Sequence, residues 1–358
     1  FFKKYKPDSS EDSFTYEEAL APQINWEPYK FNLAEKIEVK KYQADTAVAI
    51  VACDRPSYFS EVVQSIARNS IVHDLPVFGF FDEPKDDITV RDEQIREFRK
   101  YLPKGVVIRR PRNFGCGRNL IDARRQLLDN MGYQKIFMFE DDLVISENYI
   151  QLCLNLLEWS KEFNDIGAVQ AWNVNKNSKE TRSLRRGVVN GTFENLWGYL
   201  ITKECWDSFK NDLYRYEELF LGGEYKYRPH KSIRKWLDLK IAKGVNRSGV
   251  KPPFVSDERY VESMLAYLKG GPTGQDGVSA VLMSCAGWKR IATEVPRAKY
   301  IGKIGIHSNA KRYESSGYQH VVLNYFPEDT DLHSFALSSN VGSYHEDVDS
   351  NGFLHIEM

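Results

Sequence analysis

The sequence has no surplus of charge of either sign, since 49 Lys and Arg residues are balanced by 50 Asp and Glu residues, for a formal net charge of -1. A balanced chain has no global attraction to nucleic acid or to a membrane surface, so we expect no nucleic-acid partner. No apolar run reaches the ~18 residues that a membrane-spanning helix needs. Internal repeats and low-complexity tracts are also missing. What remains is an ordinary globular composition, 42% hydrophobic and 28% charged, with enough length for a large core in one or two domains.

Cysteine is scarce and scattered. The five cysteines contain no C-x-x-C pair, which argues against a zinc site and against a dense disulfide framework, although one or two bridges fit the count. Because the chain starts with Phe1 rather than Met, a signal peptide or a membrane anchor trimmed from the N-terminus is one explanation, and the compartment stays open.

The common phosphate-binding loops are missing as well. The loop 109–119 is basic and carries glycines, and its arginines suit bidentate contacts to phosphate. It lacks the Gly-Lys-Ser/Thr of a P-loop, and Gly115 and Gly117 have no third glycine at the spacing of a dinucleotide-binding loop. A solvated turn is the alternative interpretation.

Apolar runs alternate with helical patterns in the first half of the chain. Strands are predicted at 46–52, 76–81 and 106–108, with helices between them, the first capped by Ser57. This alternation predicts an α/β fold with a mostly parallel sheet and crossover helices. The strands end in polar or charged residues, which predicts a charged crevice along one sheet edge, the usual ligand side; these residues are Asp54, Asp82, Arg109 and Glu140.

The run 135–145 is apolar at both ends and holds three consecutive acids, Glu140, Asp141 and Asp142, in its middle. Burying three unpaired carboxylates is costly because they repel one another, and a cation is the simplest remedy. Mg²⁺ and Mn²⁺ accept one or two carboxylates together with substrate phosphates. A strand that ends in a solvated acidic turn is the alternative.

The second half is less regular. A strand is predicted at 166–172, a basic surface helix at 230–243, and a strand at 298–306 that ends at His307. Asp276 follows a glycine-rich loop, where a helix N-cap is the simple explanation. Trp172 and Trp197 suit either a plain core or packing against a sugar ring.

Taken in order, these pieces resemble the GT-A glycosyltransferases, and more closely the N-acetylglucosaminyltransferase I group and its O-mannose-pathway relatives. The resemblance covers roughly residues 46 to 310. The matching pieces are the strand ends at Cys53-Asp54-Arg55 and Asp82, Glu140-Asp141-Asp142-Leu143, Ala171-Trp172-Asn173, Leu196-Trp197-Gly198-Tyr199, Asp276 and His307.

The resemblance implies an inverting, metal-dependent transfer of a sugar from a UDP-sugar to an acceptor hydroxyl, with a glycan as the expected acceptor. Asp142 would ligate Mn²⁺ or Mg²⁺, with His307 near the metal or a phosphate. Asp276 would be the general base. The remaining donor contacts would come from a set of residues around the crevice: Asp54, Arg55, Asp82, Arg118, Glu140, Asp141 and Trp197.

The resemblance also implies an organisation: an N-terminal arm at 1–45, a donor-binding half at 46–210, an acceptor-side half at 211–324 and a C-terminal tail at 325–358. The compartment would be the Golgi lumen if the resemblance holds, or the cytoplasm for a bacterial or viral chain. Glu83 stands where the family commonly has a cysteine, so its disulfide to the position of Cys53 is unsupported. Asp257 and Glu258 are alternative bases.

Two other functions are weighed against the transferase. A sugar-nucleotide-forming nucleotidyltransferase shares the sheet and the acids, but it usually carries a glycine-rich loop with Lys or Arg after the first strand, where this chain has Cys53-Asp54-Arg55-Pro56. A non-catalytic nucleotide-sugar or carbohydrate-binding module of the same fold is the third hypothesis.

Overall fold

The fold is known from a computed structural model of the chain. It describes residues 45–174, 179–192, 197–222, 228–242, 273–305 and 309–338, together with 347–348 and 354–355. Within these residues, no helix is both long enough and apolar enough to cross a membrane. Their five cysteines are all free, so the one or two bridges that the count allowed are not formed.

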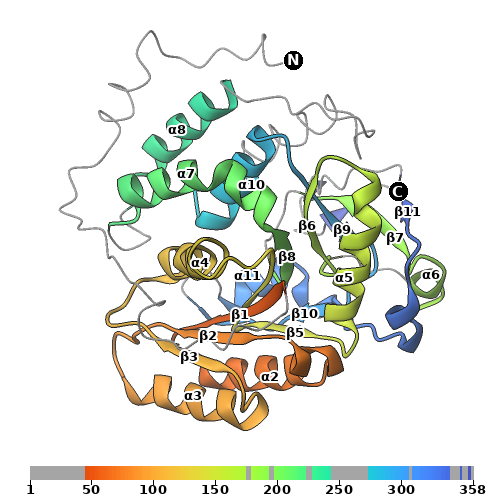
Figure 1. Ribbon diagram of the computed structural model, residues 1–358, viewed down its shortest axis with the longest axis horizontal. Helices are drawn as coiled ribbons and strands as arrows, with labels where there is room; N and C mark the ends of the chain where they lie inside the picture. The colour runs from red at the N-terminus through yellow and green to blue at the C-terminus, as the bar shows by residue number, and fades with distance from the viewer. Residues whose placement is uncertain are drawn as a thin grey trace.

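A nine-stranded sheet runs through the molecule in the order β11-β7-β9-β6-β8-β4-β1-β2-β3 (Figure 1). β1, β2, β3 and β4 pair in parallel, β8 runs antiparallel to β4 and β6, and β9 pairs in parallel with β6. The strands are β1 (Thr46–Ala52), β2 (Val77–Phe81), β3 (Val106–Arg109), β4 (Lys135–Glu140), β6 (Ile166–Gln170), β7 (Val188–Gly191), β8 (Tyr199–Thr202), β9 (Lys289–Thr293) and β11 (Ala336–Leu337). The predicted α/β fold with a mostly parallel sheet is confirmed.

Helices cover both faces of this sheet. In Figure 1, α2 and α3 lie below the first strands, while α4, α7, α8 and α10 lie above them. The helices are α2 (Pro56–Ala67), α3 (Thr89–Tyr101), α4 (Cys116–Arg124), α5 (Tyr149–Trp159), α6 (Lys179–Leu184), α7 (Lys203–Phe220), α8 (His230–Ala242), α10 (Gln275–Cys285) and α11 (Ala310–Ser315). This is the layered arrangement that parallel sheets need, because both of their faces must be buried.

The alternation of side chains along β1 divides the core into two clusters. Ala47, Ala49 and Val51 pack with α4, α7, α8 and α10, whereas Val48 and Ile50 pack with α2, α3 and α5. Since neighbouring residues of a strand point to opposite faces, an all-apolar strand can serve both layers.

The acidic run does not continue as one strand. β4 ends at Glu140, Asp141 and Asp142 form a turn, and β5 (Leu143–Ile145) pairs with β10 (Ala298–Tyr300) in a separate two-stranded sheet. The turn lifts the two aspartates out of the main ladder, at the carboxyl end of a central strand.

Several element predictions were wrong in detail. Ser57 is not a cap, because α2 begins with Pro56 at its first position and Arg55 is the N-cap residue. β9 was not predicted, and it lies between β6 and β7 in the sheet. α7 runs through residue 210, and β9 from beyond it belongs to the same sheet as β1; the division of the chain into two halves stays a prediction. The short pair β12 (Asp347–Val348) and β13 (Leu354–His355) is antiparallel.

Candidate active site

Four chain segments, those at β1, β2, β4 and β8, meet at one edge of the sheet. β1, β2 and β4 are parallel, so the residues that follow them, Asp54, Asp82 and Asp141 among them, emerge on the same side. β8 is antiparallel to β4, and its amino end, preceded by Trp197, therefore lies at that edge too. The predicted crevice of polar strand ends is thus built from backbone direction alone.

Arg55 is the cation that neutralises the acidic turn. Its Nη1 donates to Asp142 Oδ2 at 2.7 Å, its Nε donates to Asp141 Oδ2 at 3.3 Å, and its Nη2 donates to Asp141 Oδ1. The two aspartate side chains are only 5% and 8% exposed, while the arginine side chain keeps 24% of its surface. The acids therefore do not form a solvated turn; they are buried against a guanidinium that reaches the surface.

The carboxyl groups of the cluster resist ionisation. Burial raises the pKa of Asp141 to about 6 although Arg55 opposes the rise, and burial likewise raises the pKa of Asp142. Burial raises the pKa of Glu140 well above its usual range, and repulsion from Asp276, Asp142 and Asp141 adds to the effect. Glu140 is therefore harder to ionise than a free glutamate, and in its neutral form it is able to donate a hydrogen bond.

Asp276 comes to this cluster from the opposite layer. It lies in the first turn of α10, whose N-cap is Gly274, so the simple explanation of Asp276 as an N-cap is wrong. Burial raises the pKa of Asp276 to about 6; Arg124 and Arg290 lower it, and Asp142 raises it. The mutual effect of Asp276, Glu140 and Asp142 on one another places the predicted base within electrostatic reach of the acidic turn.

Asp82 organises a loop. It is 1% exposed, and its carboxylate accepts backbone N–H groups from Glu83, Phe114 and Gly115 at 2.7 to 3.0 Å. Gly115 has φ of +73°, a conformation that suits glycine. Asp82 therefore fixes the end of the basic loop beside the strand ends, and its predicted contact to the donor stays a prediction.

The other predicted donor contacts differ in their surroundings. Asp54 is exposed at the end of β1. Arg118 is almost buried, donates to the Leu221 carbonyl and lies 3.7 Å from Glu217, so it ties α4 to α7. Arg110, also from the basic loop, is buried and pairs with Asp122 at 2.5 Å. Three of the four arginines of the loop thus form internal ion pairs, and the donor roles stay predictions.

Trp197 belongs to an aromatic cluster against the acidic turn. Its ring stacks on Tyr300 at 4.3 Å between centroids and 12° between planes, and it lies 5.7 Å from Trp172. Tyr300 in turn hydrogen-bonds to the Asp142 side chain. Trp172 is 1% exposed and belongs to the core, whereas Trp197 is half-buried.

The segment 301–305 crosses over Asp142 and Arg55. The Ile301 N–H donates to the Asp142 carbonyl at 2.8 Å, and a Cβ added at Gly302 would lie 2.7 Å from Asp142 Oδ2. A Cβ at Gly305 would lie 3.2 Å from Arg55 Nη1. His307, like the alternative bases Asp257 and Glu258, lies outside the described residues.

The acidic turn fits a hard divalent ion. The described residues contain no group of three His, Cys, Asp or Glu side chains placed to hold a metal. Mg²⁺ and Mn²⁺ need only one or two protein carboxylates when substrate phosphates complete the coordination shell of the ion. The available donors are carboxylate oxygens, and Glu140 Oε1 is buried without a hydrogen-bond partner. An ion at Asp142 would exchange with the Arg55 guanidinium.

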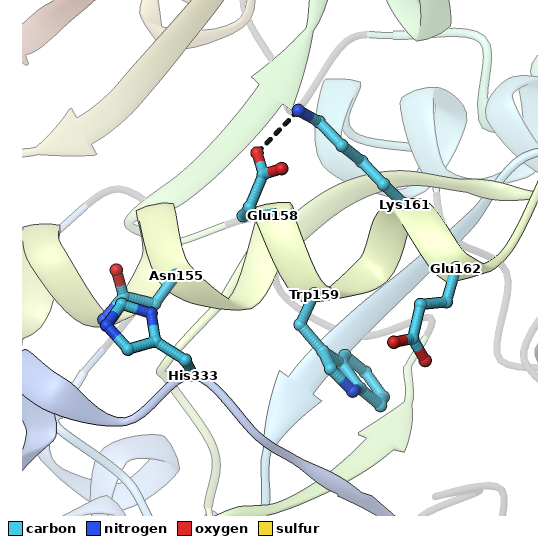
Figure 2. Close-up of a pocket in the computed structure, with 6 residues that line it drawn as sticks. All are labelled: Asn155, Glu158, Trp159, Lys161, Glu162 and His333. Carbon is cyan, nitrogen blue, oxygen red and sulfur yellow. Dashed lines mark ion pairs between the residues drawn. The ribbon is translucent and has the colours of Figure 1, made fainter.

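A separate surface cavity of about 610 Å³ lies between α5 and the segment near His333 (Figure 2). Its lining includes Trp159 and the ion pair of Glu158 with Lys161 at 2.5 Å. None of its lining residues belongs to the acidic cluster, so this cavity is distinct from the candidate active site.

Sequence reasoning missed the basic side chains behind Asp276. Arg124 and Arg290 are both completely buried, and both lower the pKa of Asp276. Arg124 lies in the middle of the helix expected at about 118–131, where a surface arginine is the usual assignment, and Arg290 lies in the strand that was not predicted. Their sequence neighbourhood gave no signal that they face an acid.

No protein-family model matches the chain. No curated protein sequence matches it. Among solved structures, it is similar to TarS from S. aureus in complex with UDP, at 13% identity and a TM-score of 0.34 over 54% of this chain and 55% of that chain. It is also similar to the mannosyltransferase PcManGT from Pyrobaculum calidifontis in complex with GDP-Man and Mn²⁺, at 11% identity and a TM-score of 0.34 over 67% of this chain and 85% of that one.

A third similar structure is glucosyl-3-phosphoglycerate synthase from Mycobacterium tuberculosis with Mn²⁺, UDP-glucose and phosphoglyceric acid, at 14% identity and a TM-score of 0.33 over 63% of this chain and 88% of that one. The chain spans about half the length of the TarS chain that it matches. TM-scores of this size do not assign a function; the topology and the side chains of this chain are the basis for one.

Proposed function

We propose that this chain is an inverting, divalent-metal-dependent glycosyltransferase of the GT-A type that moves a sugar from a UDP-sugar to an acceptor hydroxyl. One observation carries the proposal: the acidic turn with Arg55 and the carboxyl group of Asp276, from opposite layers of the fold, are brought to the same edge of a mostly parallel sheet. That edge is where ligands of open α/β folds bind.

The acidic turn supplies the donor side. Asp142, a buried carboxylate with Arg55 as an exchangeable partner, would hold Mn²⁺ or Mg²⁺ together with the donor diphosphate. The bound ion would offset the negative charge that develops on the leaving diphosphate. Arg55, released from Asp142, would bind a phosphate oxygen, since a guanidinium suits phosphate as well as carboxylate.

Neighbouring side chains would bind the rest of the donor. Asp141 would accept a hydrogen bond from the ribose, and Glu140, whose pKa is raised by burial, would in its neutral form donate to a sugar hydroxyl. Asp82 would place the loop around the uracil, with Asp54 and Arg118 at its border. Trp197 would flank the sugar, and His307 would add a metal or phosphate contact.

Asp276 would accept the proton of the acceptor hydroxyl. Its pKa of about 6 leaves it mostly ionised at pH 7 and close enough to neutrality to be an effective base. A base on the face opposite the leaving group permits a single displacement with inversion at the anomeric carbon. Asp276 reaches the acidic turn from α10, whereas Asp54 and Asp82 follow the strands β1 and β2.

The resemblance to the N-acetylglucosaminyltransferase I group, the division at residues 45, 210 and 324, and a Golgi or cytoplasmic location remain parts of this proposal. A glycan is the proposed acceptor. A nucleotidyltransferase is less favoured because β1 runs into α2 at Pro56 without a glycine-rich loop to hold a triphosphate.

The test is UDP release from a panel of UDP-sugars with Mn²⁺, with and without EDTA. We expect turnover that EDTA and Asp142→Ala each abolish, whereas Asp92→Ala, which removes an exposed carboxylate on α3, leaves it unchanged. UDP binding without turnover over a broad acceptor panel would favour the binding module. Pyrophosphate release from UTP and a sugar phosphate would favour the nucleotidyltransferase.

A further inference from the structure

Behind Asp276 lies a buried relay of hydrogen bonds that joins α4 to α10. Arg124, the last residue of α4, donates through Nη2 to Gln275 Oε1, and Gln275 Nε2 donates to Asp276 Oδ1. Arg124 also donates through Nη1 to Ser279 Oγ at 3.3 Å and through Nε to the Leu120 carbonyl at 3.2 Å. Arg124 is completely buried and Gln275 is 5% exposed, so the contact between these two side chains is shielded from solvent.

The arginine fixes the orientation of the glutamine amide. A guanidinium only donates hydrogen bonds, so the Gln275 oxygen must face Arg124 and the amide NH₂ must face Asp276. An NH₂ group donates a hydrogen bond to an ionised carboxylate. It does not stabilise a protonated carboxyl group whose O–H points at the same NH₂. The charge of Arg124 is therefore transmitted to Asp276 as a fixed donor, and the Asp276 oxygens keep one orientation.

The two helices are held close enough for this relay. A Cβ added at Gly117 of α4 would lie 3.6 Å from Gln275 Cβ, which is ordinary contact distance. The Arg124 guanidinium also lies 5.3 Å from the centre of the Trp206 ring of α7. The arginine is thus packed on three helices and cannot swing away from Gln275 without opening the core.

Other charged and titratable groups face Asp276 from every element around it. Glu140 and Asp142 oppose its ionisation from the acidic turn, and Arg290 of β9 favours it. In the described part of the chain, Arg124 forms no ion pair with a carboxylate. Its guanidinium donates to the side-chain oxygen of Gln275, and it therefore acts on Asp276 through Gln275. Asp276 also helps to raise the pKa values of two further groups, Cys116 and Tyr199.

We propose that Arg124, acting through Gln275, is a positioning residue that holds Asp276 ionised and aimed as the proton acceptor. The proposal rests on the proposed function, because it takes Asp276 as the base. It assigns to the α4–α10 contact the task of keeping the Asp276 carboxylate ready to accept a proton.

The first test is Gln275→Glu, which keeps the size of the side chain and leaves Arg124 paired. The new carboxylate would bind Arg124 and repel Asp276. We expect the midpoint of the rising limb of kcat against pH to move up by about one to two units, with kcat at pH 7 lowered about two- to tenfold. The KM for the donor and the affinity for UDP stay unchanged, because neither residue touches the donor site.

The second test removes the charge with Arg124→Met, and its control is Ser279→Ala, which deletes one hydrogen bond of Arg124 and keeps its charge. We expect the midpoint to rise in Arg124→Met and to stay in place in Ser279→Ala. A purely structural role would lower the melting temperature and donor affinity of Arg124→Met and leave the midpoint where it was. If Arg124→Met does not fold, Gln275→Glu still decides the question.

A readout without turnover separates this inference from the proposed function. The Asp276 carboxyl carbon is titrated by ¹³C NMR and assigned by its loss in Asp276→Asn. An upward shift of its midpoint in Gln275→Glu supports the relay even in a chain that releases no UDP, an outcome that would contradict the transferase alone. An unchanged midpoint in Gln275→Glu overturns the relay, whether or not UDP is released.

Discussion

At the scale of single residues, the acidic turn shows how far sequence reasoning reaches. Three consecutive acids after a buried strand predicted that a cation must be present, and the structure has one in Arg55. The sequence could not identify that cation, because Arg55 lies 86 residues from Asp141 and is brought to it only by the parallel pairing of β1 with β4. A divalent ion stays the prediction for the loaded enzyme.

Arg55→Met tests this counter-ion role. Losing one partner of a mostly buried pair leaves uncompensated charge, so we expect a loss of roughly 3 kcal/mol in the free energy of unfolding at pH 7.5. The loss should shrink at pH 4.5, where the carboxyl groups are protonated. Urea denaturation at both pH values measures it. Arg55→Lys keeps the charge but not the forked geometry and should lose less; an equal loss for Arg55→Met at both pH values would contradict the role.

Asp276→Asn separates catalysis from stability. We expect turnover to fall by a factor on the order of 10² or more, with UDP affinity nearly intact, because the proton acceptor is lost. The same variant should have a higher melting temperature than the parent at pH 7.5, since it removes a charge that burial and Asp142 disfavour. Activity assays, UDP titration and thermal unfolding check the three parts. A near-normal rate would move the base to Asp257 or Glu258.

At the scale of elements, the strands that were predicted are those made of continuous apolar runs, such as β1. β9 was missed because it begins with Lys289 and Arg290, whose burial depends on distant partners: Lys289 pairs with Asp165 at 2.5 Å. Tertiary contacts thus override local composition at that strand. The run 135–145 was interpreted as one strand because Leu143–Ile145 is also apolar. Its sequence does not indicate that these residues pair in a different sheet.

The turn before β8 depends on a glycine. Gly198 has φ of +62°, and a Cβ there would lie 2.6 Å from Leu143 Cδ2 and 3.0 Å from the Tyr149 hydroxyl, which itself donates to the Gly198 carbonyl at 2.6 Å. We expect Gly198→Ala to cost about 2 to 4 kcal/mol in unfolding free energy, from backbone strain and overpacking together.

Gly132→Ala is the matched control for that turn. Gly132 has φ of +77° but open space around the site of a Cβ, so the substitution should cost only the backbone strain, about 1 kcal/mol. Chemical denaturation of the two variants side by side gives the difference. Equal losses would mean that the packing of Gly198 against Leu143 and Tyr149 contributes nothing.

At the scale of the whole molecule, residues 326–338 are part of the core fold and not merely a tail over the surface. Arg297 is completely buried and pairs with Asp329 through Nε at 2.8 Å and Nη2 at 3.2 Å. Asn148 and Asn155 of the α5 region donate to the carbonyls of Phe326 and Thr330, and β11 adds to the sheet beside β7. The tail was predicted from its acidic composition. Composition alone does not reveal that one of its acids, Asp329, pairs with a buried arginine.

The acidic edge also sets how the stability of the whole chain depends on pH. Asp141 and Asp276 have folded pKa values of about 6, against about 3.9 for an unfolded aspartate. Between these values the folded chain binds more protons than the unfolded chain, so the free energy of unfolding falls as pH rises from about 4 to about 6. Asp45, Asp87 and Asp207, whose pKa values are lowered, act in the opposite direction, but they lie at the surface and contribute less.

We therefore expect urea denaturation in EDTA to show unfolding free energy that decreases by roughly 3 kcal/mol for Asp141 alone over this range. Mn²⁺ with UDP should reduce the decrease, because a metal binds the ionised carboxylates and makes their protonation unfavourable. Asp141→Asn should flatten the profile in EDTA, while Asp92→Asn, at an exposed ion pair, should not. A profile that rises between pH 4 and 6 in EDTA, and that Asp141→Asn leaves unchanged, would mean that the buried acids are not the groups that govern the stability of this fold.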